Sequence, residues 1–270
     1  MKKTDKEDSL KLAHIVEDIP EERLPAVPVP SEQEMERRKL LACYRRAQQN
    51  RNRDINRLHG ILLGQGITTM GRKELSTGEF RKEAIQALTG TGCQEAEYLA
   101  VCLELHERQM ETVDRQMREE TAGDEVIERL QSVPGVGPMV AFAFASHVAA
   151  ERFENSGQVS NYLGLVPRVY MSGDTVRYGQ ITKLGNGYIR ALLVQGAWAL
   201  TRSKKGGKLK ERYEYMTVEK SISKKKAIVA IARRMAELLY TLMRDGTGYE
   251  ERRFVREKKG EELARLAMSA

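Results

Sequence analysis

One serine stands out among the residues whose types and spacing could do chemistry. Ser172 lies beside Gly173 in the segment Gly164–Asn186, and three cations follow it: Arg177, Lys183 and Arg190. A serine hydroxyl becomes a nucleophile when a base or a positive field assists it. Arginine and lysine stabilise the charge that develops on phosphoryl oxygens. The segment predicts a serine that attacks a DNA phosphodiester. The alternative is a turn serine that hydrogen-bonds its own backbone.

A glycine-rich turn precedes this segment by about thirty residues. The sequence Val133-Pro-Gly-Val-Gly137 separates two helical stretches, in the pattern helix, Pro-Gly-x-Gly turn, helix that is typical of a helix-hairpin-helix. Gly135 and Gly137 would let backbone N–H groups approach phosphate oxygens at a helix N-terminus. A tight helical turn that binds no ligand is the alternative.

The chain is basic, with a formal net charge of +7, and the excess gathers near its C-terminal end. Between Leu200 and Ala236 there are twelve cations and three acids. We expect this region to lie along phosphates; a solvated helical face is the alternative. The predicted DNA contacts here and at the start of the preceding helix are Asn186, Lys204, Lys205, Lys224 and Lys225.

Two carboxylates near the N-terminus could hold a metal ion. Asp5 and Asp8 are three residues apart, on one face of a short predicted helix, as two metal-binding carboxylates would be. Two carboxylates alone hold one Mg²⁺ weakly, and two-metal phosphoryl transfer recruits more ligands. N-terminal capping by Asp5 is the alternative. The three cysteines show no zinc spacing, so no zinc site is predicted.

Two long helices must position much of this chemistry. In residues 31–123 a 3-4 spacing of apolar and polar positions predicts a helix that ends near Gly64, a shorter helix over Gly78–Leu88, and a second long helix over Gln94–Glu120. The seams are Leu41, Tyr44, Gln48, Arg51, Ile55, Leu58 and Leu62, and then Leu99, Cys102, His106, Gln109, Val113 and Gln116. We expect an antiparallel coiled-coil arm that forms homo-oligomers; an ordinary helical bundle within one subunit is the alternative.

Residues 124–250 predict a compact, mostly α domain. Asp124 caps a helix through Ser132, Pro138–Ala150 is buried, and strands over Val166–Met171 and Thr175–Ile181 form a small β-hairpin with Ser172 at its tip. Buried helices follow to Leu200 and over Lys224–Met243. Residues 1–30 end in a Pro-rich connector, and 251–270 form a charged tail. No apolar run reaches the length of a membrane span, so we expect a cytoplasmic protein with no membrane partner.

These motifs, in this order, resemble a known family. Lys3-Thr-Asp-Lys-Glu-Asp-Ser9 is similar to the K-T-D-x-x-D-A motif of the DEDD-type insertion-sequence transposases, the bridge-RNA-guided recombinases of insertion-sequence family one-hundred-ten, related to the Piv invertases. The other matching motifs are Val133–Gly137, Tyr162–Pro167, Ser172-Gly173, Lys183-x-Gly-Asn186, Arg190 and the segment that begins at Lys224.

The resemblance implies a function. Family members join a RuvC-like domain carrying a DEDD metal site to a coiled-coil arm and a domain with a nucleophilic serine, and they recombine DNA with a structured guide RNA and Mg²⁺. By position, Ser172 matches the nucleophile, while Asp5 and Asp8 match the last two DEDD acids. The family's first Asp and its Glu lie upstream of K-T-D, so we expect a truncated copy with residues 1–30 as a RuvC-like remnant. The alternatives are a non-catalytic nucleic-acid-binding or dimerising remnant that regulates a full-length transposase, and a helical scaffold.

Overall fold

The structure is a computed structural model that describes residues 5–20, 29–172 and 175–250. The chain divides into two units, Met1–Glu32 and Gln33–Ala270. The first contains α1 (Asp5–Asp18), and the other helices and the strands belong to the second from Gln33 onward. The predicted boundaries at residues 31, 124 and 251 stay predictions, and the tail 251–270 lies outside the described residues.

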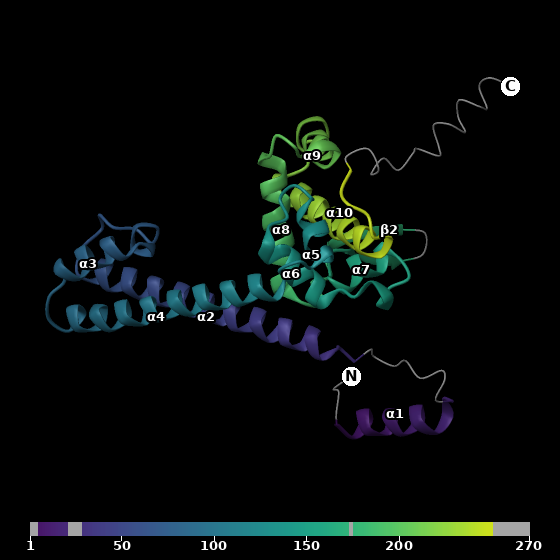
Figure 1. The fold of residues 1–270 in the computed structure, drawn as a ribbon, viewed down its shortest axis with the longest axis horizontal. Helices are drawn as coiled ribbons and strands as arrows, with labels where there is room; N and C mark the ends of the chain where they lie inside the picture. Colours follow the sequence, from purple (N-terminus) through teal and green to yellow (C-terminus); the bar gives the residue numbers. More distant parts are fainter. Residues whose placement is uncertain (1–4, 21–28, 173–174, 251–270) are drawn as a thin grey trace. The chain divides into compact units, whose positions relative to one another are not determined.

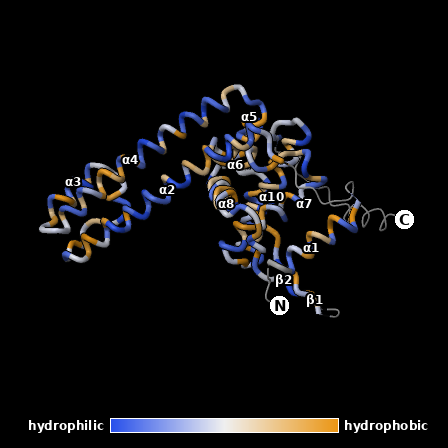
Figure 2. Tube along the Cα trace, turned by 90° about the horizontal axis from the view of Figure 1, so that it is seen from below, coloured by the Kyte–Doolittle hydropathy of each residue, from blue (hydrophilic) through white to orange (hydrophobic). Residues whose placement is uncertain are grey.

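Two long helices, α2 (Glu32–Gly64) and α4 (Gly90–Glu120), run antiparallel and are joined by a short 3₁₀ turn, η2 (Glu74–Ser76), and α3 (Gly78–Gln86) (Figure 1). Apolar residues of α2 face α4: Ile55, Leu58 and Leu62 pack with Ala96, Leu99 and Leu103 in one buried cluster. Figure 2 shows both helices as mostly hydrophilic, with the hydrophobic positions interspersed. The predicted helical hairpin is therefore confirmed, whereas its supercoiling stays a prediction.

The seam of α4 differs from the predicted one at alternate positions. Gln109 and Gln116, both predicted to face α2, are exposed. The buried positions are instead Leu103 and Met117, so the seam runs through Leu99, Leu103, Val113 and Met117. The physical reason is that apolar side chains one residue further along the helix can pack against α2.

Charged residues occupy the middle of the arm, as the polar seam position at Arg51 predicted. Arg51 donates from Nε to Glu107 Oε1 at 2.8 Å, and Arg81 donates from Nη2 to Glu107 Oε2 at 2.7 Å. Burial acts to raise the pKa of Glu107, but these hydrogen bonds outweigh it and hold the pKa below its ordinary value. Paired charges at one level of two helices favour one register over its neighbours.

The rest of the second unit is a helical core: α5 (Glu125–Gln131), α6 (Pro138–His147), α7 (Ser156–Tyr162), α8 (Gly187–Arg202), α9 (Gly207–Glu214) and α10 (Lys224–Asp245). A 3₁₀ turn, η3 (Ala150–Arg152), precedes α7, and a π-helical turn, η4 (Tyr215–Glu219), follows α9. The amphipathic α10 packs against α7 and α8. Its buried residues include Ile228, Ile231, Met235, Leu238, Leu239 and Leu242, as its periodicity predicted.

A single ladder of two antiparallel strands interrupts the helices within the described residues, formed by β1 (Pro167–Ser172) and β2 (Thr175–Ile181). The mostly α fold with a small β-hairpin is thus confirmed. No helix in the described ranges is both long and apolar enough to cross a membrane.

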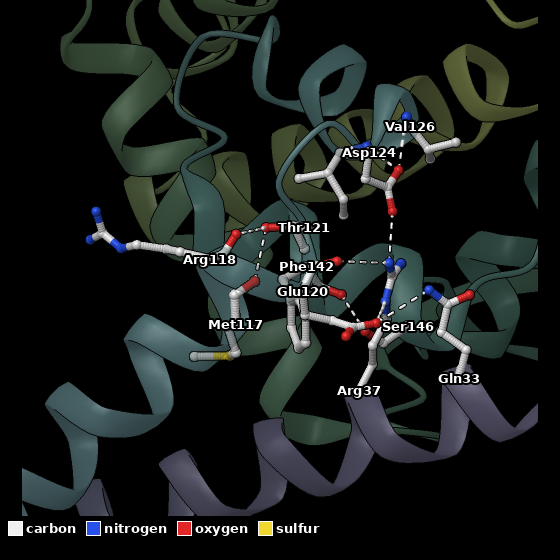
Figure 3. Close-up of polar contacts among 11 residues, drawn as sticks. Gln33, Arg37, Met117, Arg118, Glu120, Thr121, Asp124, Val126, Phe142 and Ser146 are labelled. Atoms are coloured by element: carbon white, nitrogen blue, oxygen red, sulfur yellow. Dashed lines mark hydrogen bonds and ion pairs between the residues drawn. The ribbon is translucent and has the colours of Figure 1, made fainter.

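The arm is fixed to the helical core by a polar junction (Figure 3). Arg37 of α2 donates from Nη2 to Asp124 Oδ2 at 2.8 Å, and Arg38 donates from Nε to the carbonyl oxygen of Ser146 at 2.7 Å. The other carboxylate oxygen of Asp124 accepts from the backbone N–H groups of Val126 and Ile127, which caps α5 as predicted. One carboxylate therefore joins the arm to the start of the core.

Candidate nucleic-acid interface

Ser172 is the last residue of β1 and is exposed. Its register partner on β2 is Thr175, and the next pairs back along the ladder are Met171 with Val176 and Tyr170 with Arg177. Gly173 and Asp174, at the tip, lie outside the described residues. A serine at the end of an exposed hairpin is open to a large substrate such as a nucleic acid.

The hairpin has two chemically different faces. Side chains alternate along a strand, and directly opposed residues share a face. Ser172 therefore shares one face with Thr175, Tyr170 and Arg177, whereas the other face is apolar, with Val169, Met171, Val176 and Tyr178 all exposed. The guanidinium of Arg177 thus belongs to the same face as the Ser172 hydroxyl, as the proposed phosphoryl chemistry requires.

The base of the hairpin is held by backbone contacts. Lys183 adopts a left-handed conformation with φ 56°, and its N–H donates to the carbonyl oxygen of Gly164 at 3.2 Å. Arg190 Nη1 donates to the carbonyl oxygens of Leu163 at 3.0 Å and Leu184 at 2.6 Å. Arg190, predicted as a DNA contact, therefore has a structural role at the hairpin base. Contact of either cation with DNA stays a prediction.

The two glycines of the Pro-Gly-x-Gly turn have different surroundings. Gly135 has φ 85°, and a Cβ there would lie 2.3 Å from the carbonyl oxygen of Gly196 on α8. Gly137 is the exposed N-cap of α6, with nothing within 4 Å of the position of an added Cβ. Gly135 thus allows the turn to pack closely on α8. Gly137 leaves the positive end of α6 open to an anion.

Exposed lysines gather where helix electrostatics disfavour them. Lys224 and Lys225 lie in the first turn of α10, which carries no acidic residue. Cations at a helix N-terminus oppose the macrodipole, so helix stability does not explain them. Lys204 and Lys205 are exposed between α8 and α9. All four predicted lysines are therefore available to phosphates.

The two predicted metal-binding acids lie at the start of α1. The side chain of Asp5 is outside what the structure describes, and Asp8 is partly buried. The described residues contain no group of three or more His, Cys, Asp or Glu side chains that could hold a metal ion. These residues do not complete a Mg²⁺ site, and no chemical step proposed below passes through the metal.

Sequence reasoning missed three arginines at the junction of the arm and the core. Arg38, Arg45 and Arg46 line an open pocket of about 230 Å³ between α2, the C-terminal end of α6 and the start of α8. Arg38 and Arg45 are seven residues apart and so lie on one face of α2. This spacing was a signal in the sequence, but the residues opposite it come from two distant segments.

His147 lies in the same pocket and is held neutral. Burial lowers its pKa from the ordinary value, and the nearby Arg38 lowers it further, although a hydrogen bond to Ala143 acts to raise it. Nδ1 lies 3.1 Å from the carbonyl oxygen of Ala143, and Nε2 lies 3.2 Å from Nδ2 of Asn186. A neutral ring that donates from Nδ1 and accepts at Nε2 satisfies both contacts.

Comparison with known proteins points to one family for the C-terminal half. Residues 127–214 match the family described as Transposase IS116/IS110/IS902. A probable family 20 transposase of Pseudomonas aeruginosa is 39% identical over 101 residues, which are 37% of this chain and 30% of the relative. The transposase for insertion sequence element IS1111A of Coxiella burnetii is 32% identical over 131 residues, 48% of this chain and 36% of the relative.

A longer match extends over most of the chain. The putative transposase y4rJ of Sinorhizobium fredii is 27% identical over 240 residues, which are 82% of this chain and 61% of the relative. The chain thus spans between 30% and 61% of the length of these three curated relatives. It is similar to insertion-sequence transposases, most clearly over residues 127–214.

Proposed function

We propose that this chain, similar over residues 127–214 to transposases of the IS116/IS110/IS902 family, is a DNA recombinase of insertion-sequence elements with Ser172 as its nucleophile. One observation carries the proposal. Ser172 is exposed at the end of β1, on the hairpin face that also carries Arg177, inside the segment that matches the family.

The reaction is a phosphoryl transfer. The Oγ atom of Ser172 attacks a DNA phosphorus, a P–Oγ bond forms, and the bond from phosphorus to the leaving sugar oxygen breaks. The Oγ proton passes to solvent, and the leaving oxygen is protonated in turn. Arg177 stabilises the charge on the non-bridging oxygens. The phosphoserine link conserves the bond energy, so that a second sugar hydroxyl can reverse the step and rejoin the strands.

The partners proposed are DNA, a structured guide RNA and a second copy of the chain. The glycine turn at Gly137 and the lysines of α10 support contact with phosphates. Support for self-association comes from α4, where Tyr98, Val101 and Leu105, named here the arm patch, follow a 3-4 spacing and are 66%, 66% and 63% exposed. A 3-4 apolar stripe on a helix is typical of a helix–helix interface. Mg²⁺ is proposed as cofactor through the longer relatives' chemistry, with Asp5 and Asp8 as ligands.

A covalent adduct tests the catalytic role. We would incubate the full chain with element-junction DNA, its flanking RNA and Mg²⁺, and then run a denaturing gel beside Ser172→Ala and Thr175→Ala. Thr175 is a matched control because it is the register partner of Ser172 and carries an exposed hydroxyl. We expect a shifted band in the wild type and in Thr175→Ala, and none in Ser172→Ala.

Two results would contradict the catalytic proposal. A band that persists in Ser172→Ala would exclude this serine as the nucleophile. Absence of any band while DNA binding persists would favour the second candidate, a nucleic-acid-binding protein that regulates a full-length transposase. The exposed lysines in the first turn of α10 favour that candidate specifically, since they serve binding with or without cleavage.

A further inference from the structure

The strongest unassigned feature of the molecule is the pocket between the arm and the helical core. Arg38, Arg45 and Arg46 of α2 line one side, and His147, Asn186 and Tyr188 line the other. Its volume of about 230 Å³ is far more than one water molecule needs. The remaining lining residues, within the described part of the chain, are uncharged. Three positive charges therefore face the pocket and no carboxylate lines it.

The arginines are placed by their neighbours so that they point at the pocket. The guanidinium carbon of Arg45 lies 5.1 Å from the ring centroid of Tyr188, a cation–π contact that fixes its direction. Arg38 is held by its Nε bond to the Ser146 carbonyl, while its Nη2 atom is buried and has no hydrogen-bond partner. The nearest carboxylate oxygen given for that atom, Glu34 Oε1, is 3.9 Å away. A buried donor without an acceptor favours a bound anion or water.

The opposite side of the pocket is also suited to an anion. α8 begins at Gly187, and its N-cap residue Asn186 accepts from the N–H of Tyr188 at 2.9 Å. The N-terminus of this sixteen-residue helix carries partial positive charge toward the pocket. His147 adds polar atoms without a negative charge, because it is neutral. Helix terminus and arginines therefore act in the same direction.

We propose that this pocket binds a backbone phosphate of a nucleic acid and thereby fixes the strand at the junction of the arm and the core. The inference rests on the proposed function, which supplies a nucleic-acid substrate, and it adds a specific contact site. Planar guanidinium groups bind phosphate oxygens in pairs, and an open pocket suits one phosphate of a continuous strand rather than an enclosed small molecule.

Two variants change the charge of the pocket by independent routes. Arg46→Gln removes a cation from an exposed side chain for which no ion pair is found within the described residues. Ala42→Glu adds a carboxylate at an exposed lining position without removing any contact. Arg115→Gln is the matched control, because Arg115 is exposed on the other arm helix, α4, and does not line the pocket.

Binding of the full chain to a short fluorescein-labelled duplex DNA, and to an RNA hairpin of equal length, is measured by fluorescence anisotropy at several salt concentrations. For Arg46→Gln we expect weaker binding by several-fold and a salt slope lower by about one, as for one lost phosphate contact. Ala42→Glu weakens binding further, and Arg115→Gln changes it less than either. A loss on DNA, on RNA or on both supports the site and identifies its source.

Two negative outcomes have different meanings. If the wild type binds both probes and the two pocket variants match Arg115→Gln, the phosphate site is refuted while the proposed recombinase function stands. If the wild type binds neither probe, or binds with an affinity that does not depend on salt, the proposed function fails as well. Thermal unfolding of each variant separates these results from loss of the fold.

Discussion

Replacement of Gly135 by alanine tests the division of labour within the Pro-Gly-x-Gly turn. At φ 85°, a non-glycine residue is strained by about 1–3 kcal/mol. The added Cβ would also lie 2.3 Å from the Gly196 carbonyl oxygen and 2.7 Å from the Leu200 nitrogen, so the backbone of α8 must shift. Overpacking costs about 1–3 kcal/mol more. We expect Gly135→Ala to lower the free energy of unfolding by at least about 2 kcal/mol.

Gly137 provides the matched comparison two residues away. An alanine there meets nothing within 4 Å and keeps an allowed conformation at φ −89°, so Gly137→Ala should cost less than about 1 kcal/mol. Gly137→Asp is more informative still. Aspartate is a favourable N-cap, so the free energy of unfolding should hold or rise, whereas the added negative charge should weaken DNA binding at the start of α6.

The assay is urea unfolding followed by the fluorescence of Trp198, the one tryptophan of the chain, which lies on α8 two residues after Gly196. DNA affinity is measured on the same samples by anisotropy. The reasoning is refuted if Gly135→Ala unfolds at the wild-type urea concentration, or if Gly137→Ala is destabilised as strongly as Gly135→Ala. Unchanged DNA affinity in Gly137→Asp would remove this turn from the nucleic-acid interface.

Two further predictions concern pH and self-association. The pKa of His147 is lowered in the folded chain from an ordinary value of 6.5, so the free energy of unfolding should be full above about pH 6.5 and fall as the pH decreases through the folded pKa, because the unfolded chain takes up the proton first. Urea unfolding between about pH 8 and pH 5 should show a weaker dependence in His147→Gln, and an equal slope would contradict the assignment. Val101→Glu in the arm patch should reduce the mass measured by light scattering toward that of a monomer, while Val218→Glu, at another valine that is 75% exposed, should not; a monomeric wild type would refute self-association through this patch.

The sequence predicted helix ends well where a side chain or glycine marks them. Asp124 and Asn186 accept hydrogen bonds from the N–H groups that start α5 and α8. Gly246 closes α10 in a left-handed conformation. Such caps act through neighbours in sequence, so their chemistry is visible without a fold. The hairpin was placed to within one residue for the same local reason.

The register of α4 could not be chosen from the sequence in the same way. Two apolar 3-4 stripes lie on this helix, one through Leu99 and Leu103 that faces α2 and one through the arm patch that is exposed. Periodicity shows that stripes exist, but only the packing partner decides which is buried. The prediction chose positions between them at Gln109 and Gln116.

The role of Arg190 was equally hidden. Spacing placed it among cations near Ser172, and in the structure its guanidinium bonds to backbone carbonyl oxygens. Carbonyl groups are present at every residue, so sequence carries no mark of which ones will converge on a cation. The arginine pocket was missed because residues near 42, 147 and 187 meet only after α2 packs on α6 and α8.

The start of α8 links the pocket to the hairpin. Asn186 lines the pocket and caps the helix, and Arg190, one turn later, bonds to the Leu163 and Leu184 carbonyl oxygens at the hairpin base. An isolated two-stranded hairpin is marginally stable, so the position of Ser172 depends on this base. Phosphoryl transfer requires close alignment of the attacking oxygen. A phosphate bound in the pocket would therefore align the strand against the same helix terminus that positions the nucleophile.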